Sequence, residues 1–214
     1  MKIQRFEFNP LQENTYILFD DTKECVIIDP GCYDAEEREE LTSFISANNL
    51  VVKALWNTHC HIDHVLGNAF VKRTYNTKLW IHPADEPVLK AVKSYASNYG
   101  FHQYEETSVD EYFKEDQRIL FGDQSLKVLF LPGHAPGHVG FYHEADKVII
   151  AGDVLFYNSI GRTDLPGGNY DTLIRSIQQK LFQLPDDVTV YPGHGPETSI
   201  GYEKRTNPFC AIIK

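Results

Sequence analysis

The sequence predicts an α/β protein with a core of two sheet layers and helices outside each sheet. Short strand-like runs alternate with amphipathic segments along most of the chain, and the second half repeats the order of strands, helix and strand. Hydrophobic residues make up 42% of the 214 residues, which is enough for one sizeable core. We therefore expect a single domain over residues 1–214.

The first half opens with three strand-like runs, KIQRFEF at 2–8, NTYILF at 14–19 and CVIID at 25–29. A helix is expected over 34–50, because Asp34 can cap it and Glu37 follows three residues later, as in a capping box. VVKALWN at 51–57 reads as a buried strand. A histidine-rich loop, a helix through 65–70 and a strand at 78–81 follow.

The pattern weakens from about residue 84 to 116, where we expect a helix through Val88, Leu89 and Val92 and then an irregular loop on the substrate side. Three strands are predicted next, at 125–132, 138–144 and 147–153. A helix with Leu173 and Ile177 on one face then leads to the strand VTVYP at 188–192.

The chain carries 20 basic and 30 acidic side chains, a formal charge of −10, which repels phosphate backbones and anionic membrane surfaces. It contains no apolar run of about 18 residues and no apolar stretch behind a basic start. Its four cysteines form no CxxC pair, which fits a reducing compartment. We expect a soluble cytoplasmic protein with no nucleic-acid or membrane partner; the residues do not define an oligomeric state.

The stretch THCHIDH, residues 58–64, crowds titratable groups directly after a predicted strand. Side chains two positions apart in an extended segment project to the same side, so His59 and His61 can bind one metal ion. Asp63 and His64 follow at the start of the next helix and suit a neighbouring ion or an orienting role. Cys60 points away from its neighbours in such a segment, which favours packing over metal binding.

Further metal-binding residue types follow other predicted strands. His134 and His138 follow the strand SLKVLF, Asp153 follows KVII and His194 follows VTV, each in a turn marked by Gly or Pro. A catalytic zinc-type site needs three protein ligands and an open position. Four separate segments that carry such residues at strand ends indicate a metal site rather than a polar surface.

The order THCHIDH, GHAPGH, GD and PGHG resembles the metallo-β-lactamase superfamily, which implies a four-layer αββα sandwich with a dinuclear metal cleft. The resemblance implies that the first metal is held by His59, His61 and His134, and the second by Asp63, His64 and His194. It implies that Asp153 is the carboxylate that bridges the two metals. It also implies that Asp29 orients the loop from beneath and that His138 is a neighbour of His134 that does not bind metal. Asp29 is equally well explained as a strand-end residue that opens the turn at Pro30 and Gly31.

This ligand set implies two divalent ions, zinc first, with iron or manganese as alternatives. Two ions that share a water lower its pKa from ~15.7 toward ~7 and so supply a metal-bound hydroxide for attack on a carbonyl carbon. Asp63 is placed to orient that hydroxide or to accept its proton. We therefore expect Asp63 to be catalytic as well as metal-binding.

The two aspartates and the histidine set resemble the glyoxalase II group, thioesterases that act on acyl-glutathione substrates. The chain runs only 20 residues past His194, so the helical domain that holds glutathione in that group is missing or rebuilt. The GRTD element also resembles persulfide dioxygenases, where a single iron would be held by His59, His134 and Asp153. Arg162 in GRTD is either a substrate contact or the partner of Asp164 in an ion pair that fixes the loop.

Overall fold

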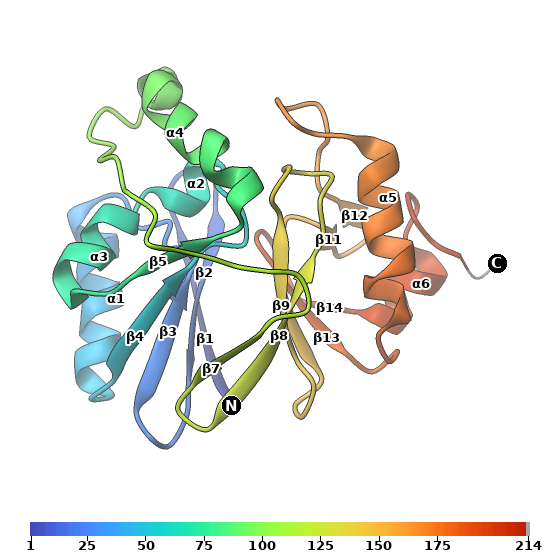
Figure 1. Cartoon of the computed structure of the whole chain (residues 1–214), viewed down its shortest axis with the longest axis horizontal. Helices are drawn as coiled ribbons and strands as arrows, with labels where there is room; N and C mark the ends of the chain where they lie inside the picture. The colour runs from blue at the N-terminus through green and yellow to red at the C-terminus, as the bar shows by residue number, and fades with distance from the viewer. Residues whose placement is uncertain (213–214) are drawn as a thin grey trace. The chain divides into compact units, whose positions relative to one another are not determined.

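The computed structural model describes residues 1–212, and the chain forms two compact units (Figure 1). The first unit comprises Met1–Phe113 and Leu120–Ser125, and the second comprises Lys114–Ile119 and the chain from Leu126 onward. Each unit is built around a six-stranded sheet. The single domain expected over residues 1–214 stays a prediction.

The first sheet has the strand order β1-β2-β3-β4-β5-β6. Its strands are β1 (Lys2–Phe8), β2 (Glu13–Phe19), β3 (Glu24–Ile28), β4 (Val51–Trp56), β5 (Leu79–Ile81) and β6 (Glu111–Tyr112). Neighbours from β1 to β3 are antiparallel, whereas those from β3 to β6 are parallel. Because parallel strands end at the same edge, the residues that follow β3 and β4 meet there.

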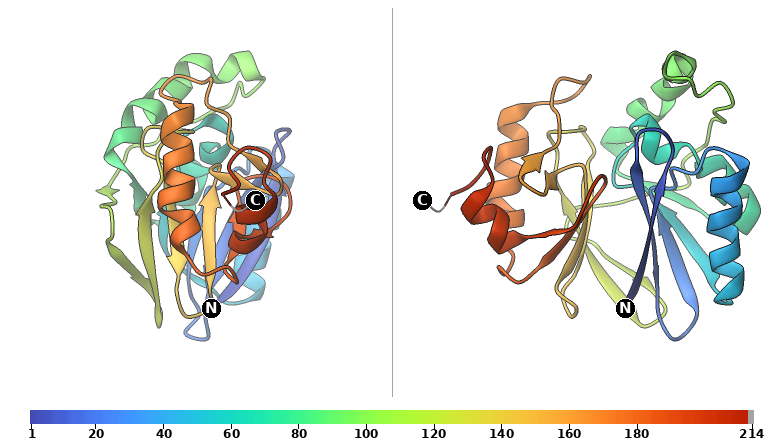
Figure 2. Two further views of the ribbon diagram at one scale, coloured as in Figure 1. Left: turned by 90° about the vertical axis from the view of Figure 1, so that its right-hand side faces the viewer. Right: turned by 180° about the vertical axis from the view of Figure 1, so that it is seen from behind.

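Helices of the first unit cover one face of this sheet, as Figure 2 shows for α1 and α3. The helical elements are α1 (Ala35–Ala47), α2 (Ile62–Val65), α3 (Asn68–Tyr75), η1 (Pro83–Asp85), α4 (Glu86–Tyr95) and η2 (Ala96–Tyr99). The predicted capping box is present, with the Asp34 side chain accepting from the Glu37 N–H at 2.9 Å. Leu41 and Ile45 of α1 lie in the same buried cluster as Ile27 of β3. The amphipathic pattern thus placed this helix correctly.

The single helix expected through residues 65–70 is wrong, because the structure has two short helices, α2 and α3. The Gly67 N–H donates to the Pro30 carbonyl at 2.7 Å. A Cβ on Gly67 would lie 2.6 Å from Cys32 Sγ, so only glycine fits this close approach. The break between α2 and α3 therefore allows Gly67 to pack against the turn that follows β3. Helical periodicity does not reveal this contact.

The second sheet lies mainly in the second unit and has the order β14-β13-β10-β9-β8-β7. Its strands are β7 (Arg118–Phe121), β8 (Gln124–Phe130), β9 (Val139–His143), β10 (Val148–Gly152), β13 (Thr189–Pro192) and β14 (Thr198–Ser199). β9 is antiparallel to both β8 and β10, and β10 is parallel to β13. The carboxyl ends of β8, β10 and β13 consequently share one edge.

The helices of the second unit are α5 (Tyr170–Gln179), η3 (Leu181–Gln183) and α6 (Ile200–Thr206), and a small hairpin pairs β11 (Leu155–Phe156) with β12 (Ser159–Ile160). α5 and α6 lie on one face of the sheet (Figure 2). Leu173 and Ile177 of α5 and Ile200 of α6 pack in one buried cluster with Ile149 of β10. Five short elements of two to seven residues each were not expected from the sequence: β7, β11, β12, β14 and α6.

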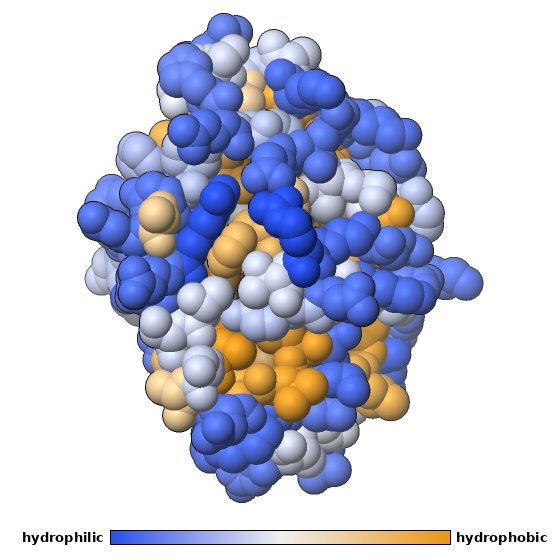
Figure 3. All heavy atoms as spheres, turned by 90° about the vertical axis from the view of Figure 1, so that its left-hand side faces the viewer, coloured by the Kyte–Doolittle hydropathy of each residue, from blue (hydrophilic) through white to orange (hydrophobic). Residues whose placement is uncertain are grey.

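The surface carries mainly polar side chains where Figure 3 displays it, with one apolar area among them. This agrees with the excess of acidic residues and with exposed ion pairs such as Arg73–Glu105. In the part of the chain that the structure describes, every helix is too short or too polar to cross a bilayer.

Candidate metal centre

His59 follows β4 and is oriented by the residue before it. The Thr58 N–H and hydroxyl donate to the two oxygens of Asp29 at 2.7 and 2.6 Å. The Thr58 Oγ1 also lies 3.1 Å from His59 Nδ1. Because the hydroxyl hydrogen is used by Asp29, Oγ1 accepts from His59 Nδ1–H. This tautomer leaves the Nε2 lone pair of His59 for a metal ion.

His61 lies at the N-cap of α2, and its ring is perpendicular to that of His59 with 4.8 Å between the ring centroids. Cys60 between them is fully buried in the core cluster of the first unit. Burial, and to a lesser degree the nearby Asp85, raise the pKa of the Cys60 thiol well above its ordinary value. Cys60 therefore packs as a neutral thiol, in the direction that the alternation of the HxH segment predicts.

His64 is held from beneath by Asp29. Its Nδ1 donates to Asp29 Oδ2 at 3.2 Å, so its Nε2 carries the lone pair, and this atom lies 3.7 Å from Asp63 Oδ2. Asn57 Nδ2 donates to the His64 carbonyl at 2.9 Å and to Asp29 Oδ1 at 3.3 Å. His64 Nε2 and Asp63 Oδ2 thus form a pair of ligand atoms.

Asp29, His59 and His64 also offer ligand atoms that lie within 4.8 Å of one another. The Asp29 carboxylate, however, already accepts hydrogen bonds from Thr58, Asn57 and His64. An engaged carboxylate of this kind orients metal-binding histidines rather than binding the ion itself. Asp29 directly follows β3 with a left-handed backbone, φ 49°, as expected of a residue that opens the turn at Pro30, and its role as an orienting residue of a metal site stays a prediction.

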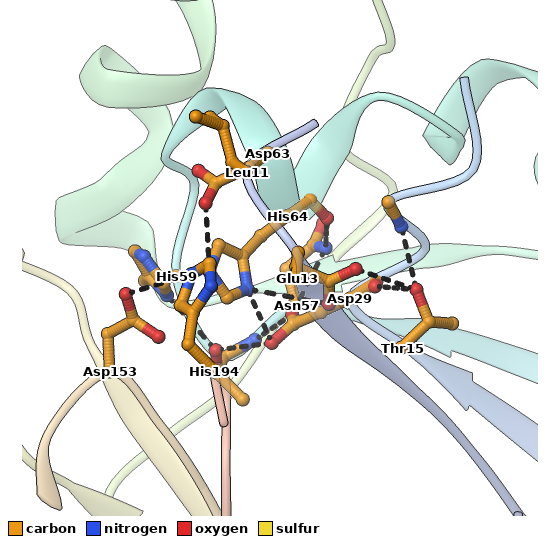
Figure 4. Close-up of polar contacts among 12 residues, drawn as sticks. Leu11, Glu13, Thr15, Asp29, Asn57, His59, Asp63, His64, Asp153 and His194 are labelled. Carbon is orange, nitrogen blue, oxygen red and sulfur yellow. Dashed lines mark hydrogen bonds and ion pairs between the residues drawn. The ribbon is translucent and has the colours of Figure 1, made fainter. Parts of the chain in front are cut away.

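Glu13 is a buried residue of this site that the sequence analysis missed. Its Oε1 lies 3.8 Å from His64 Nδ1, and Figure 4 shows the His64 ring in contact with both Glu13 and Asp29. Burial raises the pKa of the Glu13 carboxyl well above its ordinary value. Gly31 packs so closely that a Cβ there would lie 2.1 Å from Glu13 Oε2. Glu13 opens a strand, and nothing in its local pattern marked it as part of a site.

The second unit brings His134, Asp153 and His194 together at the shared strand edge. Asp153 Oδ2 lies 3.5 Å from His134 Nε2 and 3.6 Å from His194 Nε2. His134 Nδ1 donates to the Arg162 carbonyl at 2.8 Å, so its Nε2 is the ligand atom. Two imidazoles that present Nε2 to one carboxylate oxygen are arranged as in a carboxylate-bridged metal site.

His138 supports Asp153 through the main chain. Its buried ring accepts, at Nε2, the backbone N–H of Asp153 at 3.0 Å. The Nε2 lone pair of His138 is therefore engaged by the Asp153 N–H. A ring in this state fits the role of a neighbour that does not bind metal.

Arg162 forms a two-pronged ion pair with Asp164, with both N···O distances 2.7 Å and both side chains mostly exposed. The hydrogen bond from Arg162 lowers the pKa of Asp164 to about 2. The structure thus contains the ion pair that the sequence offered as one of two alternatives, and the role of Arg162 as a substrate contact stays a prediction. Its carbonyl also orients His134, a main-chain role that residue type does not signal.

A model of the metallo-beta-lactamase superfamily matches residues 8–194, most of the chain. The chain belongs to the metallo-β-lactamase superfamily. Hydroxyacylglutathione hydrolase GloC of Haemophilus influenzae is 39% identical over 98% of each chain. Two solved structures are also similar. BLEG-1 B3 metallo-beta-lactamase is 33% identical, with a TM-score of 0.87 over 99% of this chain and 100% of that chain. A di-iron-bound form of TTHA1623 is 36% identical, with a TM-score of 0.86 over 96% of this chain and 99% of that chain.

These similarities confirm the predicted α/β fold of metallo-β-lactamase type. As a member of this superfamily the chain is a metallo-hydrolase with a histidine-rich candidate metal site. The donor chemistry fits such a group, because imidazole nitrogens and carboxylate oxygens are ligands that zinc, iron and manganese all accept.

Proposed function

We propose that this metallo-hydrolase is a dinuclear thioesterase of the glyoxalase II type, which cleaves acyl-glutathione thioesters. The observation that carries the proposal is the orientation of the histidines. Three of them, His59, His64 and His134, donate Nδ1–H to the protein and so keep Nε2 for a metal. Carboxylates lie beside two of these Nε2 atoms, Asp63 at His64 and Asp153 at His134.

The superfamily to which the chain belongs supports a centre with two divalent ions. His59, His61 and His134 would hold the first ion, Asp63, His64 and His194 the second, and Asp153 would bridge them. Each ion would then have three protein ligands of its own and a share of Asp153, which meets the need of a catalytic site for three protein ligands and an open position. Zinc is the first candidate, and the di-iron-bound relative at 36% identity supports iron as an alternative.

When bound, two such ions lower the pKa of a water from ~15.7 toward ~7 and polarise the thioester carbonyl. The protein then has to orient the attacking water and take up its proton. Asp63 is 9% exposed, with Oδ2 directed to the His64 ring, and its carboxylate can accept that proton. Asp29 keeps the His64 ring in one tautomer, and the Asp153 backbone is fixed by His138.

The substrate class rests on the relative named hydroxyacylglutathione hydrolase, which matches this chain over 98% of both lengths. A thioester of a hydroxy acid with glutathione is therefore the first substrate to test. The protein would act on this small molecule in the cytoplasm, with no nucleic-acid or membrane partner, as its charge of −10 favours.

The proposal is tested with purified protein, metal analysis and three substrates. We expect nearly two metal equivalents and hydrolysis of S-D-lactoylglutathione. One solved relative is named a B3 metallo-β-lactamase, so a β-lactam is the second substrate. Glutathione persulfide is the third substrate. One tightly held iron with oxygen uptake on this substrate would identify a persulfide dioxygenase instead of a hydrolase. Turnover of the β-lactam without turnover of the thioester would identify a lactamase.

Asp63→Asn is expected to reduce the turnover number by about 10²–10⁴-fold, the usual contribution of a general base. The amide keeps an oxygen as a ligand but cannot accept the proton. The occupancy of the metal at His59 and His61 should therefore fall much less than the turnover number. Turnover at saturating metal and metal content of the same samples provide the comparison. A loss of rate that only follows the loss of metal at the second position would make Asp63 a ligand only.

A further inference from the structure

Asp85 is a fully buried carboxylate that contacts the metal loop from a distant part of the chain. It lies at the end of η1, after β5, and its Oδ2 accepts the backbone N–H of Cys60 at 2.6 Å. The Cys60 thiol is also hydrogen-bonded to the Asp85 side chain. Asp85 therefore contacts the amide and the thiol of the residue that separates His59 from His61.

The position of Asp85 at the N-cap of α4 makes this contact informative. An aspartate at an N-cap normally accepts a hydrogen bond from the first turn of its own helix. In the described chain the Asp85 side chain makes no such cap bond, and its carboxylate is directed at the loop instead. The backbone of Asp85 is helical because η1 leads directly into α4, and its carboxylate serves the metal loop rather than the start of this helix.

The Cys60 N–H belongs to the peptide group that joins His59 to Cys60. A fixed peptide plane restricts the backbone torsions on both sides of it, and those torsions set how the imidazoles of an extended HxH segment converge. A hydrogen bond from an amide to a carboxylate is short and roughly twice as strong as one between neutral groups. The Asp85 contact is therefore strong enough to fix this plane.

We propose that Asp85 is a positioning residue, which sets the geometry of His59 and His61 for metal binding by anchoring the intervening peptide. The inference rests on the metal centre of the proposed function, but not on the identity of the substrate. Residues that orient metal ligands without touching the ion typically change metal affinity by about 10–100-fold when they are replaced.

The test compares Asp85→Ala and Asp85→Asn with the wild-type protein. The dissociation constant for Zn²⁺ is measured by competition with a chromophoric chelator, and the visible absorption of the Co²⁺-loaded protein reports ligand geometry. We expect Asp85→Ala to weaken zinc binding by about 10–100-fold and to change the Co²⁺ spectrum. Asp85→Asn keeps the shape of the side chain and one acceptor oxygen but loses the negative charge, so we expect a smaller but measurable loss of affinity, whereas a purely steric role predicts no loss.

Asp110→Ala is the matched control. Asp110 Oδ2 accepts the Leu79 N–H at 2.8 Å and pairs with Lys72 at 2.6 Å, so it also ties a carboxylate to the strand β5 but does not reach the loop. We expect this variant to lower the melting temperature and to leave zinc affinity unchanged. Cys60→Ala keeps the amide contact and should bind zinc within a few-fold of wild type.

Zinc affinity and Co²⁺ spectra that stay unchanged in Asp85→Ala would overturn the proposal, as would an equal loss of affinity in Asp110→Ala. If Asp85→Ala does not fold, Asp85→Asn decides: an unchanged affinity and spectrum contradict the role, and a weaker affinity supports it. A wild-type protein that binds zinc but hydrolyses no thioester would end the proposed function alone, because the affinity comparison would still test Asp85.

Discussion

Replacing Asp153 with alanine is expected to abolish thioester hydrolysis, with a loss of about 10³-fold or more in kcat/KM, as for groups that directly stabilise charge in a transition state. One oxygen of Asp153 lies within 3.6 Å of both His134 Nε2 and His194 Nε2. Its removal takes away the proposed bridging ligand between the two metal ions. Kinetics with S-D-lactoylglutathione and metal analysis of the same preparation measure both consequences.

Asp187→Ala is the control for Asp153→Ala. Asp187 is an aspartate of the same unit, mostly exposed and paired with Lys147 on the surface. Exposed pairs of this kind contribute little to stability, so activity and metal content should match wild type. Full metal content and unchanged turnover in Asp153→Ala would show that the bridging assignment is wrong.

Gly133→Ala is expected to destabilise the fold by about 3 kcal/mol or more, from backbone strain and overpacking together. Gly133 has φ 135°, and a Cβ there would lie 2.3 Å from the Leu173 N and 2.4 Å from the Leu173 Cα. These are backbone atoms of α5, which cannot rotate away as a side chain could. Thermal and denaturant unfolding measure the loss.

Gly195→Ala separates the two causes. Gly195 also has a positive φ, 71°, and also adjoins a predicted metal ligand, but an added Cβ meets nothing within 4 Å. This variant should lose only about 1–2 kcal/mol, the cost of a left-handed residue that is not glycine. Equal losses in the two variants would remove the close contact with α5 as the reason for glycine at 133.

Local patterns predicted much of the fold. The capping box at Asp34 and Glu37, the apolar face of α5 and the strands that precede the metal-ligand candidates all appear where the sequence placed them. These features depend on residues within a few positions of one another. The break between the two helices at Gly67 depends instead on Pro30 and Cys32, more than 30 positions away. The local helical periodicity therefore predicted one continuous helix.

The candidate site was predictable by residue type but not in its supporting contacts. Histidine and aspartate at strand ends are recognisable from the chain, and the structure groups them within each unit as the parallel strands require. Glu13, Asp85 and the Arg162 carbonyl act through contacts across 25 to 51 positions of sequence. A carboxylate at a strand start or a helix cap has the same local pattern whether or not it faces a metal loop.

A dinuclear centre that hydrolyses acyl-glutathione thioesters should need both metal ions for full activity, which a metal titration of metal-free protein measures. Zn²⁺ is added in steps while binding and the hydrolysis rate of S-D-lactoylglutathione are recorded together. We predict that two equivalents bind and that the rate rises until the second is bound. Full activity at one equivalent, or two bound equivalents with no thioester hydrolysis, would contradict this account.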